Sequence, residues 1–263
     1  MADTPFREHV VIITGASRGI GEQLAYQLAA QGAWLALAAR SSEALEAVAS
    51  SCRARGARAL AIPTDLRDEA QCRRLVERTV HEYGRLDMLI NNAGMGFPRR
   101  FEALDDLSTI RHEIELNYLG TVYCTYYALP YLKRSRGRIV GVNSFGGLLG
   151  LPGTAGYNAS KHAMRGFLNT LRTELHGSGV SVSITYLSAV RTPRLQEVMG
   201  EQANKVPALD PARCASLILR QAARRRREQV LTLSGKTLVW LNRWAPALVE
   251  RLLASTALIS YRE

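Results

Sequence analysis

The sequence lacks an apolar segment long enough to cross a bilayer. No uninterrupted apolar run reaches the roughly 18 residues that a membrane-spanning helix requires, so we expect no transmembrane segment. Residues 1–9 mix acidic and basic side chains without an apolar stretch, so we expect no secretory signal peptide. The expected location is therefore the cytoplasm.

Cysteine is scarce, and its four residues are widely spaced. Cys52, Cys72, Cys124 and Cys214 include no close pair of the kind that binds zinc or performs dithiol chemistry. We expect reduced, mostly buried thiols, as in a cytoplasmic protein, and no metal site.

Acidic residues are outnumbered by basic ones. The chain has 34 lysines and arginines against 23 aspartates and glutamates, a formal net charge of +11. Such an excess can attract nucleic acid, anionic lipid or a phosphorylated ligand. The densest block, residues 224–227, ends a predicted helix, where cations complement the helix dipole. No nucleic-acid motif accompanies it, so we predict no nucleic-acid partner, and salt-sensitive retention on DNA would contradict this.

Seven short apolar runs alternate with helical patterns along the 263 residues. The predicted strands are residues 10–13, 34–39, 59–62, 88–91, 138–143, 180–186 and 229–233. Predicted helices include residues 20–31, 42–55 and 154–176. This alternation predicts an α/β fold, in which a doubly wound, seven-stranded parallel sheet carries helices on both faces in a single domain.

A glycine-rich turn joins the first predicted strand to the first predicted helix. The sequence Thr14-Gly-Ala-Ser-Arg-Gly-Ile-Gly21 places three glycines where open α/β sheets bind ligands. Glycine lets the backbone approach a pyrophosphate, and the helix N-terminus supplies N–H groups and positive potential. The spacing differs from the standard Gly-x-Gly-x-x-Gly fingerprint, so by itself this turn could also be only a tight connection.

Further motifs follow at successive strand ends. They are Asn91-Asn-Ala-Gly94, Ser144 and Tyr157-x-x-x-Lys161. Together with the glycine turn they resemble the short-chain dehydrogenase/reductase family, in order from Thr14 to about Thr192, roughly seven tenths of the chain.

The resemblance implies a Rossmann-type fold, a nicotinamide cofactor and a homodimer or homotetramer. In that family the glycine turn cradles the cofactor, an aspartate after the third strand touches adenine, and Asn-Asn-Ala-Gly supports the fourth strand. The implied cofactor-binding residues are Gly15, Ser17, Arg18, Gly19, Ile20, Gly21, Asp65, Leu66, Asn92, Ala93, Gly94, Tyr157, Lys161, Val190 and Thr192.

The end of the second predicted strand indicates which nicotinamide cofactor is used. A 2′-phosphate needs cations, whereas an acidic residue at this strand end binds a free 2′-hydroxyl. Here Ala39 stands where the resemblance places the acid, Arg40 follows it, and the glycine turn offers Arg18. Two arginines and no acid favour NADP(H) over NAD(H).

Tyr157 and Lys161 are four residues apart in a predicted helix and therefore share one face. A free phenol has a pKa of about 10, and we predict that the neighbouring ammonium lowers it. Tyr157 would then protonate the developing alkoxide while Ser144 hydrogen-bonds the carbonyl oxygen. The resemblance adds that Lys161 bonds the nicotinamide ribose and that Asn117 anchors a proton-relay water.

One family feature is missing after the sixth predicted strand. Members usually carry Pro-Gly there, whereas this chain has Ser188-Ala189, followed by Val190 and then by Thr192, which the family shares. An alanine in place of glycine disfavours positive φ and adds a methyl group beside the nicotinamide. Cofactor affinity or loop mobility can differ as a result.

Two segments fall outside the strand–helix alternation. Residues 188–211 are polar and rich in proline, which suggests a mobile substrate loop within a catalytic domain of residues 1–235. Residues 236–263 form an amphipathic tail with apolar positions Leu238, Leu241, Ala245, Leu248 and Leu252, beside Trp240, Arg243, Trp244 and Arg251. The tail packs on the domain or on a partner subunit, or residues 236–260 make a peripheral membrane contact.

The sequence therefore predicts an enzyme that transfers hydride between NADP(H) and a small-molecule carbonyl or secondary alcohol. An apolar substrate is expected, ketone-, steroid-, retinoid- or lipid-like, from the neighbouring residues Phe97, Phe145, Leu148, Leu149 and Leu151. The alternative is a catalytically silent NADP(H)-binding regulator, because a fold does not guarantee a function. Intact Ser144, Tyr157 and Lys161 argue against that alternative.

Overall fold

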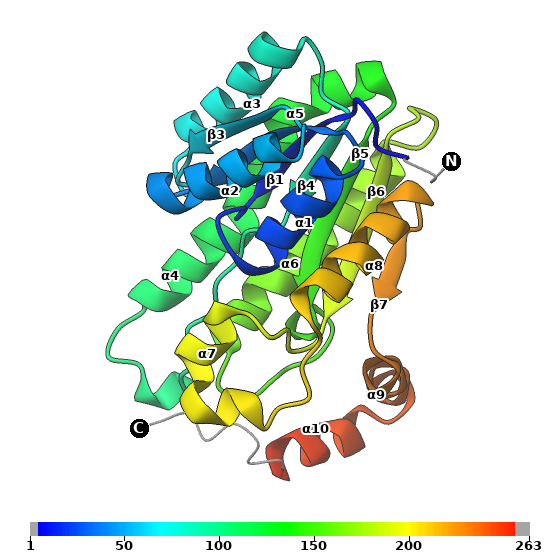
Figure 1. Cartoon of the computed structure of the whole chain (residues 1–263). Helices are drawn as coiled ribbons and strands as arrows, with labels where there is room; N and C mark the ends of the chain where they lie inside the picture. Colours follow the sequence, from blue (N-terminus) through cyan, green and yellow to red (C-terminus); the bar gives the residue numbers. More distant parts are fainter. Residues whose placement is uncertain (1–4, 256–263) are drawn as a thin grey trace.

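The computed structural model describes residues 5–255, and its strands form one parallel sheet (Figure 1). The strands are β1 Val10–Thr14, β2 Trp34–Ala39, β3 Ala59–Pro63, β4 Met88–Asn91, β5 Arg138–Ser144, β6 Ser181–Leu187 and β7 Glu228–Val230. Their order is β3-β2-β1-β4-β5-β6-β7, and every neighbouring pair is parallel. The predicted doubly wound, seven-stranded sheet in a single domain is confirmed.

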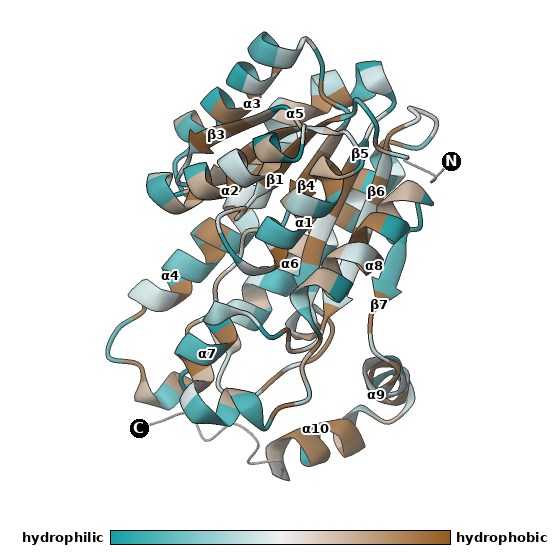
Figure 2. Ribbon diagram, in the orientation of Figure 1, coloured by the Kyte–Doolittle hydropathy of each residue, from teal (hydrophilic) through white to brown (hydrophobic). Residues whose placement is uncertain are grey.

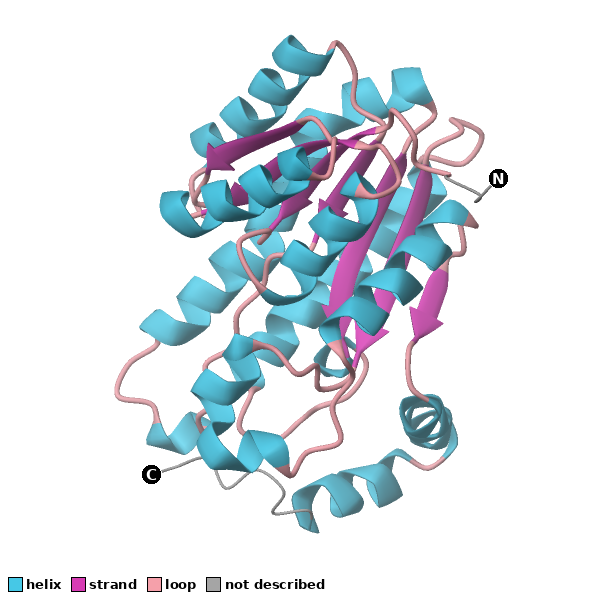
Figure 3. Ribbon diagram, in the orientation of Figure 1, coloured by secondary structure: helices cyan, strands magenta, loops and turns pink. Residues whose placement is uncertain are grey.

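Helices cover both faces of this sheet (Figure 3). They are α1 Gly19–Ala29, α2 Ser42–Ala54, α3 Glu69–Tyr83, α4 Ser108–Ile114, α5 Gly120–Ser135, α6 Ala155–Glu174, α7 Pro193–Met199, α8 Pro211–Ala223, α9 Leu233–Trp244 and α10 Pro246–Ser255. Short 3-10 segments lie at Phe101–Ala103, Phe145–Gly147 and Gly200–Asn204, and a π-helical segment lies at Glu115–Leu119.

Two apolar cores lie on opposite faces of the sheet. Alternate β1 side chains point to opposite faces, so Val11 and Ile13 join one core and Val10 and Ile12 join the other. The first core is completed by α1, α2 and α8, and the second by α3, α5 and α6. Helices therefore shield both faces of the sheet from water. Most strand residues are hydrophobic and appear brown in Figure 2.

The chain reverses its direction across the sheet between β1 and β4. It builds β1, β2 and β3 outward to one edge and then returns to place β4 beside β1. Such a reversal leaves a crevice at the carboxyl ends of the strands, where open α/β sheets bind ligands.

The predicted end of the last strand is wrong. Residues 229–233 were expected in a strand, but β7 ends at Val230 and Leu233 begins α9. Thr232 is the cause, because its side-chain oxygen accepts a hydrogen bond from the Gly235 N–H at 3.2 Å and caps the helix. The predicted boundary between residues 235 and 236 consequently falls inside α9.

The predicted substrate loop contains helical structure. Thr192 caps α7 through its side chain, and Pro193 occupies the first turn, where it has no N–H to leave unpaired. A bridge between Val190 and Leu209 closes the segment at its base. Residues 188–211 therefore form a compact unit over the crevice.

The four cysteines are free, and each is buried in the described part of the chain. Among residues 5–255, no helix has the length and apolar character needed to cross a membrane. Residues 256–263 of the predicted tail lie outside the described residues.

Candidate active site

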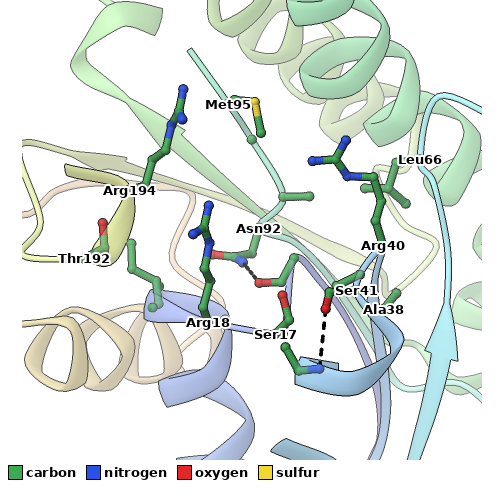
Figure 4. Close-up of a pocket in the computed structure, with 18 of the residues that line it drawn as sticks. Ser17, Arg18, Ala38, Arg40, Ser41, Leu66, Asn92, Met95, Thr192 and Arg194 are labelled. Carbon is green, nitrogen blue, oxygen red and sulfur yellow. Dashed lines mark hydrogen bonds between the residues drawn. The ribbon is translucent and has the colours of Figure 1, made fainter. Parts of the chain in front are cut away.

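The larger cavity, of about 720 Å³, lies in the crevice at the carboxyl ends of β1 to β4. It takes in most of the predicted cofactor-binding residues: Gly15, Ser17, Arg18, Gly19, Ile20, Gly21, Arg40, Leu66, Asn92, Ala93, Gly94 and Thr192. Figure 4 shows this cavity with Ser17, Arg18 and Arg40 lying around it.

The glycine turn has a backbone that only glycine accommodates. Gly15 and Gly19 have φ of +65° and +62°. A Cβ at Gly21 would lie 2.1 Å from the Gly15 carbonyl oxygen, so no side chain fits there. The turn therefore presents bare backbone at the start of α1, which fits the pyrophosphate of a dinucleotide.

Hydrogen bonds join the glycine turn to the end of β4. The Asn92 side-chain amide donates to the carbonyl oxygens of Thr14 at 2.8 Å and Gly15 at 3.1 Å. The Thr14 hydroxyl in turn accepts from the N–H groups of Asn92 at 3.0 Å and Ala93 at 3.1 Å. The two strands on either side of the crevice are thus fixed to each other.

The cavity carries two arginines at its nucleotide end. Arg18 extends from the glycine turn, and Arg40 follows β2 (Figure 4). Arg18 forms a surface ion pair with Glu197 of α7, whereas Arg40 forms no ion pair among the described residues. Ala39 leaves the end of β2 without an acid. The residues present therefore fit a nicotinamide dinucleotide.

Asp65 does not line the larger cavity, and its contact with adenine stays a prediction. Its carboxylate accepts hydrogen bonds from Arg67, including one from the backbone N–H at 3.0 Å. This hydrogen bonding with Arg67 lowers the pKa of Asp65. Leu66 lines the cavity, but the Asp65 side chain is held by its neighbour and does not contribute to the lining.

A second cavity, of about 350 Å³, adjoins the first and contains the predicted catalytic residues Ser144, Tyr157 and Lys161, together with Val190 and Thr192. Ser144 ends β5, and its side chain caps the following 3-10 turn by accepting from the Gly146 N–H at 3.2 Å. The Tyr157 side chain lines the same cavity, close enough for Ser144 to lower the pKa of its phenol. The strand end and α6 thus bring these two hydroxyls together.

Tyr157 has a raised pKa, which corrects the prediction of a lowered one. Burial raises the pKa of its phenol, the hydrogen bond with Ser144 lowers it, and the nearby Glu113 carboxyl raises it. The Lys161 ammonium lies 5.9 Å from the Tyr157 ring centroid and donates to the Val142 carbonyl at 3.2 Å. Burial is the largest of these influences on the Tyr157 phenol.

Lys161 should make the protein more stable as the pH rises. Burial lowers its pKa from 10.5 to about 8, so between these values the unfolded chain holds a proton that the folded chain lacks. The free energy of unfolding therefore increases with pH through this window. We expect Lys161→Met to be more stable than the wild type at neutral pH, with a difference that shrinks toward pH 10.5. Thermal denaturation across the window measures this, and a constant difference would contradict it.

Asn117 lies in the π-helical segment between α4 and α5, a distortion frequent at functional sites. Its side-chain amide donates to the Met95 carbonyl at 2.8 Å and to the Ser160 hydroxyl at 2.9 Å, and its oxygen accepts from the Met95 N–H. The side chain is fully buried and does not line either cavity. It holds the segment after β4 against α6.

Some residues of the site were not anticipated from the sequence. Arg194 lines both cavities and donates to the Gly96 carbonyl at 2.5 Å. Glu113 is buried and accepts from the Phe97 N–H at 2.7 Å, and burial raises its pKa. Each had a signal in the sequence, because Arg194 follows Thr192 by two positions and Glu113 precedes Asn117 by one helical turn.

The apolar residues predicted near the substrate are in other places. In the part of the chain described, Phe97, Phe145, Leu148, Leu149 and Leu151 do not line the second cavity. Its apolar wall comes instead from Met95, Pro98, Leu195, Val198 and Met199. The predicted character of the wall is present, but α7 and the segment after β4 supply most of it.

Comparison with protein families and curated proteins gives consistent matches. The family model described as short chain dehydrogenase matches residues 9–203. The 11-beta-hydroxysteroid dehydrogenase-like 4A of Arabidopsis thaliana is 36% identical over 245 residues, which cover 91% of this chain and 82% of that protein. The 11-beta-hydroxysteroid dehydrogenase A of Sesamum indicum is 34% identical over 255 residues, covering 92% and 73%.

Solved structures with similar folds belong to the same group. A short chain dehydrogenase/reductase from Burkholderia phymatum in complex with NAD has a TM-score of 0.86 at 26% identity, covering 93% of this chain and 96% of that chain. An alcohol dehydrogenase from Thermococcus sibiricus complexed with 5-hydroxy-NADP has a TM-score of 0.75 at 28% identity, covering 85% and 95%. The sheet order, the glycine turn, the hydroxyl pair beside Lys161 and these matches agree, and the chain belongs to the short-chain dehydrogenase family of oxidoreductases.

Proposed function

We propose that the protein transfers hydride between NADP(H) and an apolar carbonyl compound or secondary alcohol. The observation that carries this proposal is the meeting of Ser144, Tyr157 and the buried Lys161 amine in one cavity that adjoins the glycine-lined one. The shared lining residues Ile20, Asn92 and Thr192 indicate that the two cavities are continuous.

The chain's own residues supply the proton chemistry. The bound nicotinamide supplies the hydride in reduction and accepts it in oxidation. Ser144 hydrogen-bonds the substrate oxygen, and Tyr157 gives its proton to that oxygen as negative charge develops. The Lys161 ammonium favours the resulting phenolate. Asn117 holds Met95 and Ser160 around this group, and the water relay remains a prediction.

NADP(H) is proposed rather than NAD(H) because of the charged residues at the nucleotide end of the larger cavity. Arg18 and Arg40 bring guanidinium groups to the nucleotide end of the larger cavity, and charge-assisted pairing with a phosphate is the stronger form of hydrogen bond. The end of β2 offers no carboxylate for a free 2′-hydroxyl. The structural relatives are described with either NAD or 5-hydroxy-NADP, so the preference depends on this chain's own arginines.

The apolar wall of the second cavity supports an apolar substrate. We propose steroid carbonyls as the first class to assay, because relatives at 34% to 36% identity carry 11-beta-hydroxysteroid dehydrogenase names. Retinoid, fatty-acyl and simple ketones and aldehydes complete the panel. Loss of NADPH absorbance is the readout, with the Tyr157→Phe protein as blank. Binding of NADPH without turnover on any member of the panel would favour the silent regulator.

Gly96→Ala should slow catalysis by moving the Tyr157 ring. A Cβ at Gly96 would lie 2.9 Å from Cδ2 of Tyr157, so the ring must shift by a few tenths of an ångström. Misplacement of a reacting group is costly, and we expect kcat to fall about tenfold with NADPH binding unchanged. Steady-state kinetics at saturating NADPH measures this.

Gly150→Ala is the matched control for that substitution. Nothing lies within 4 Å of its Cβ, and its φ is not positive. It should keep wild-type kcat. An equal loss of kcat in both variants would show that an added methyl group disturbs the protein in general, and not through the Tyr157 ring.

The remaining expectations stay predictions. The catalytic unit is proposed to extend to residue 235, with a tail from residue 236, and the oligomer is proposed to be a homodimer or homotetramer. A cytoplasmic location is proposed from the free, buried cysteines.

A further inference from the structure

The outer side of α9 carries a stripe of exposed apolar side chains. Leu233, Trp240 and Trp244 are 80%, 63% and 71% exposed. Their spacing of seven and four residues places them on one face of the helix. Leu238 and Leu241 are only half-buried on the inner side. Exposed tryptophans at this density are unusual on a surface that faces only water.

The stripe continues onto α10, which is largely brown in Figure 2. After the break at Pro246, Val249 is buried and Leu248 is 49% exposed. The predicted stripe is broken at Pro246, and its two parts differ in exposure: the α9 leucines are half-buried, whereas Leu248 is exposed. Both helices thus contribute apolar groups to one outer surface, which we call the α9–α10 surface.

Cations border the α9–α10 surface. Lys236 and Arg243 are exposed beside the α9 stripe, and the Arg243 guanidinium lies 6.0 Å from the Trp244 ring centroid. Arg251 is exposed on α10, where Glu250 is the only acid between residues 233 and 255. Tryptophan and basic residues around an apolar stripe are the composition of helices that lie in a membrane interface.

The positive charge of the α9–α10 surface favours a bilayer over a second copy of the chain as its partner. Two copies meeting through this surface would each bring the same positive excess. Anionic headgroups would neutralise it, because basic residues near such a membrane surface are attracted to it. The formal net charge of +11 acts in the same direction.

The α9–α10 surface is attached to the active-site end of the molecule. A Cβ at Gly235 would lie 1.8 Å from the Phe145 ring, so the first turn of α9 packs directly on the residue after Ser144. In Figure 1, α7, α9 and α10 lie at the same end, beyond the carboxyl ends of the strands. A bilayer at this surface would lie beside the substrate cavity.

We propose that the α9–α10 surface docks the protein on an anionic bilayer, with Trp240 and Trp244 at headgroup depth and the basic residues on lipid phosphates. Docking needs no turnover, so it is tested without substrate, and its failure leaves the proposed reaction untouched.

The test is co-sedimentation of the full-length protein with vesicles of phosphatidylcholine containing about one third phosphatidylserine, against phosphatidylcholine alone. We expect binding to the anionic vesicles only, lost at high salt. Trp240→Ala/Trp244→Ala should lower the partition coefficient at least about tenfold, and Arg243→Glu about fivefold or more. Tyr126→Ala and Arg78→Glu are the matched controls, because they remove an exposed aromatic ring on α5 and an exposed cation on α3.

Brominated lipids test the depth of insertion. The chain has three tryptophans, and Trp34 is half-buried in β2. Quenching should therefore come from Trp240 and Trp244 and disappear in Trp240→Phe/Trp244→Phe. The proposal is overturned if wild type stays in the supernatant, if the controls lose binding equally, or if the alanine variants instead convert a dimer to a monomer in gel filtration without vesicles.

Discussion

Tyr157→Phe should lower kcat about a thousandfold while leaving the dissociation constant for NADPH within a few-fold of wild type. A positioned general acid contributes typically 10²- to 10⁴-fold, and phenylalanine removes the hydroxyl that gives the proton. The ring itself stays in contact with Gly96, and the larger cavity is built from other residues. The substitution should therefore reduce catalysis without weakening the binding of NADPH. Single-turnover reduction followed by NADPH absorbance, with NADPH fluorescence titration, measures both.

Tyr127→Phe provides the control for the lost hydroxyl. Its phenol donates to Glu69 at 2.7 Å on the surface, away from both cavities. It should retain wild-type kcat. Full activity in Tyr157→Phe would remove this residue from the mechanism and leave the hydroxyl of Ser144 as the remaining acid.

Arg40→Glu should raise the KM for NADPH about ten- to a hundredfold and change the KM for NADH little. Hydrogen bonds to charged groups contribute about 1.5–3 kcal/mol, and the substitution also places a carboxylate beside the 2′-phosphate. NADH has a free hydroxyl at that position, which a carboxylate can accept from. The ratio of kcat/KM for the two cofactors is the measurement.

Arg74→Glu carries the same change of charge on α3, where Arg74 is exposed and lines neither cavity. It controls for the altered net charge. Equal increases in KM for NADPH and NADH in Arg40→Glu would defeat the assignment of Arg40 to the phosphate.

Much of the fold followed from local patterns. The β-branched run of β1 and the apolar runs of β2 and β4 predicted their strands because each is short and bounded by turn residues. The end of β7 did not follow, since Leu231 and Leu233 suit either a strand or a helix. The cap at Thr232 decided between them, and a cap depends on backbone geometry that apolar periodicity does not record.

The site was predictable where motif residues sit on regular elements. Ser144, Tyr157 and Lys161 meet because a strand end and one helix face position them. The apolar wall was not predictable, since Val198 and Met199 belong to a helix in a segment expected to be a loop. The raised pKa of Tyr157 was missed for a similar reason, because burial is a property of the whole fold and not of spacing along α6.

The hydrogen bonds between Thr14 and Asn92 determine which parts of the protein can move. Shearing β1 against β4 would break several bonds at once, each with a desolvation cost of about 1–3 kcal/mol. By contrast α7 is held by fewer polar contacts: the hydrogen bond from Arg194 to the Gly96 carbonyl, and the exposed ion pair of Arg18 and Glu197, a type of contact that contributes about 1 kcal/mol at most. We therefore expect ligands to enter by displacement of α7, while β1 and β4 stay fixed to each other.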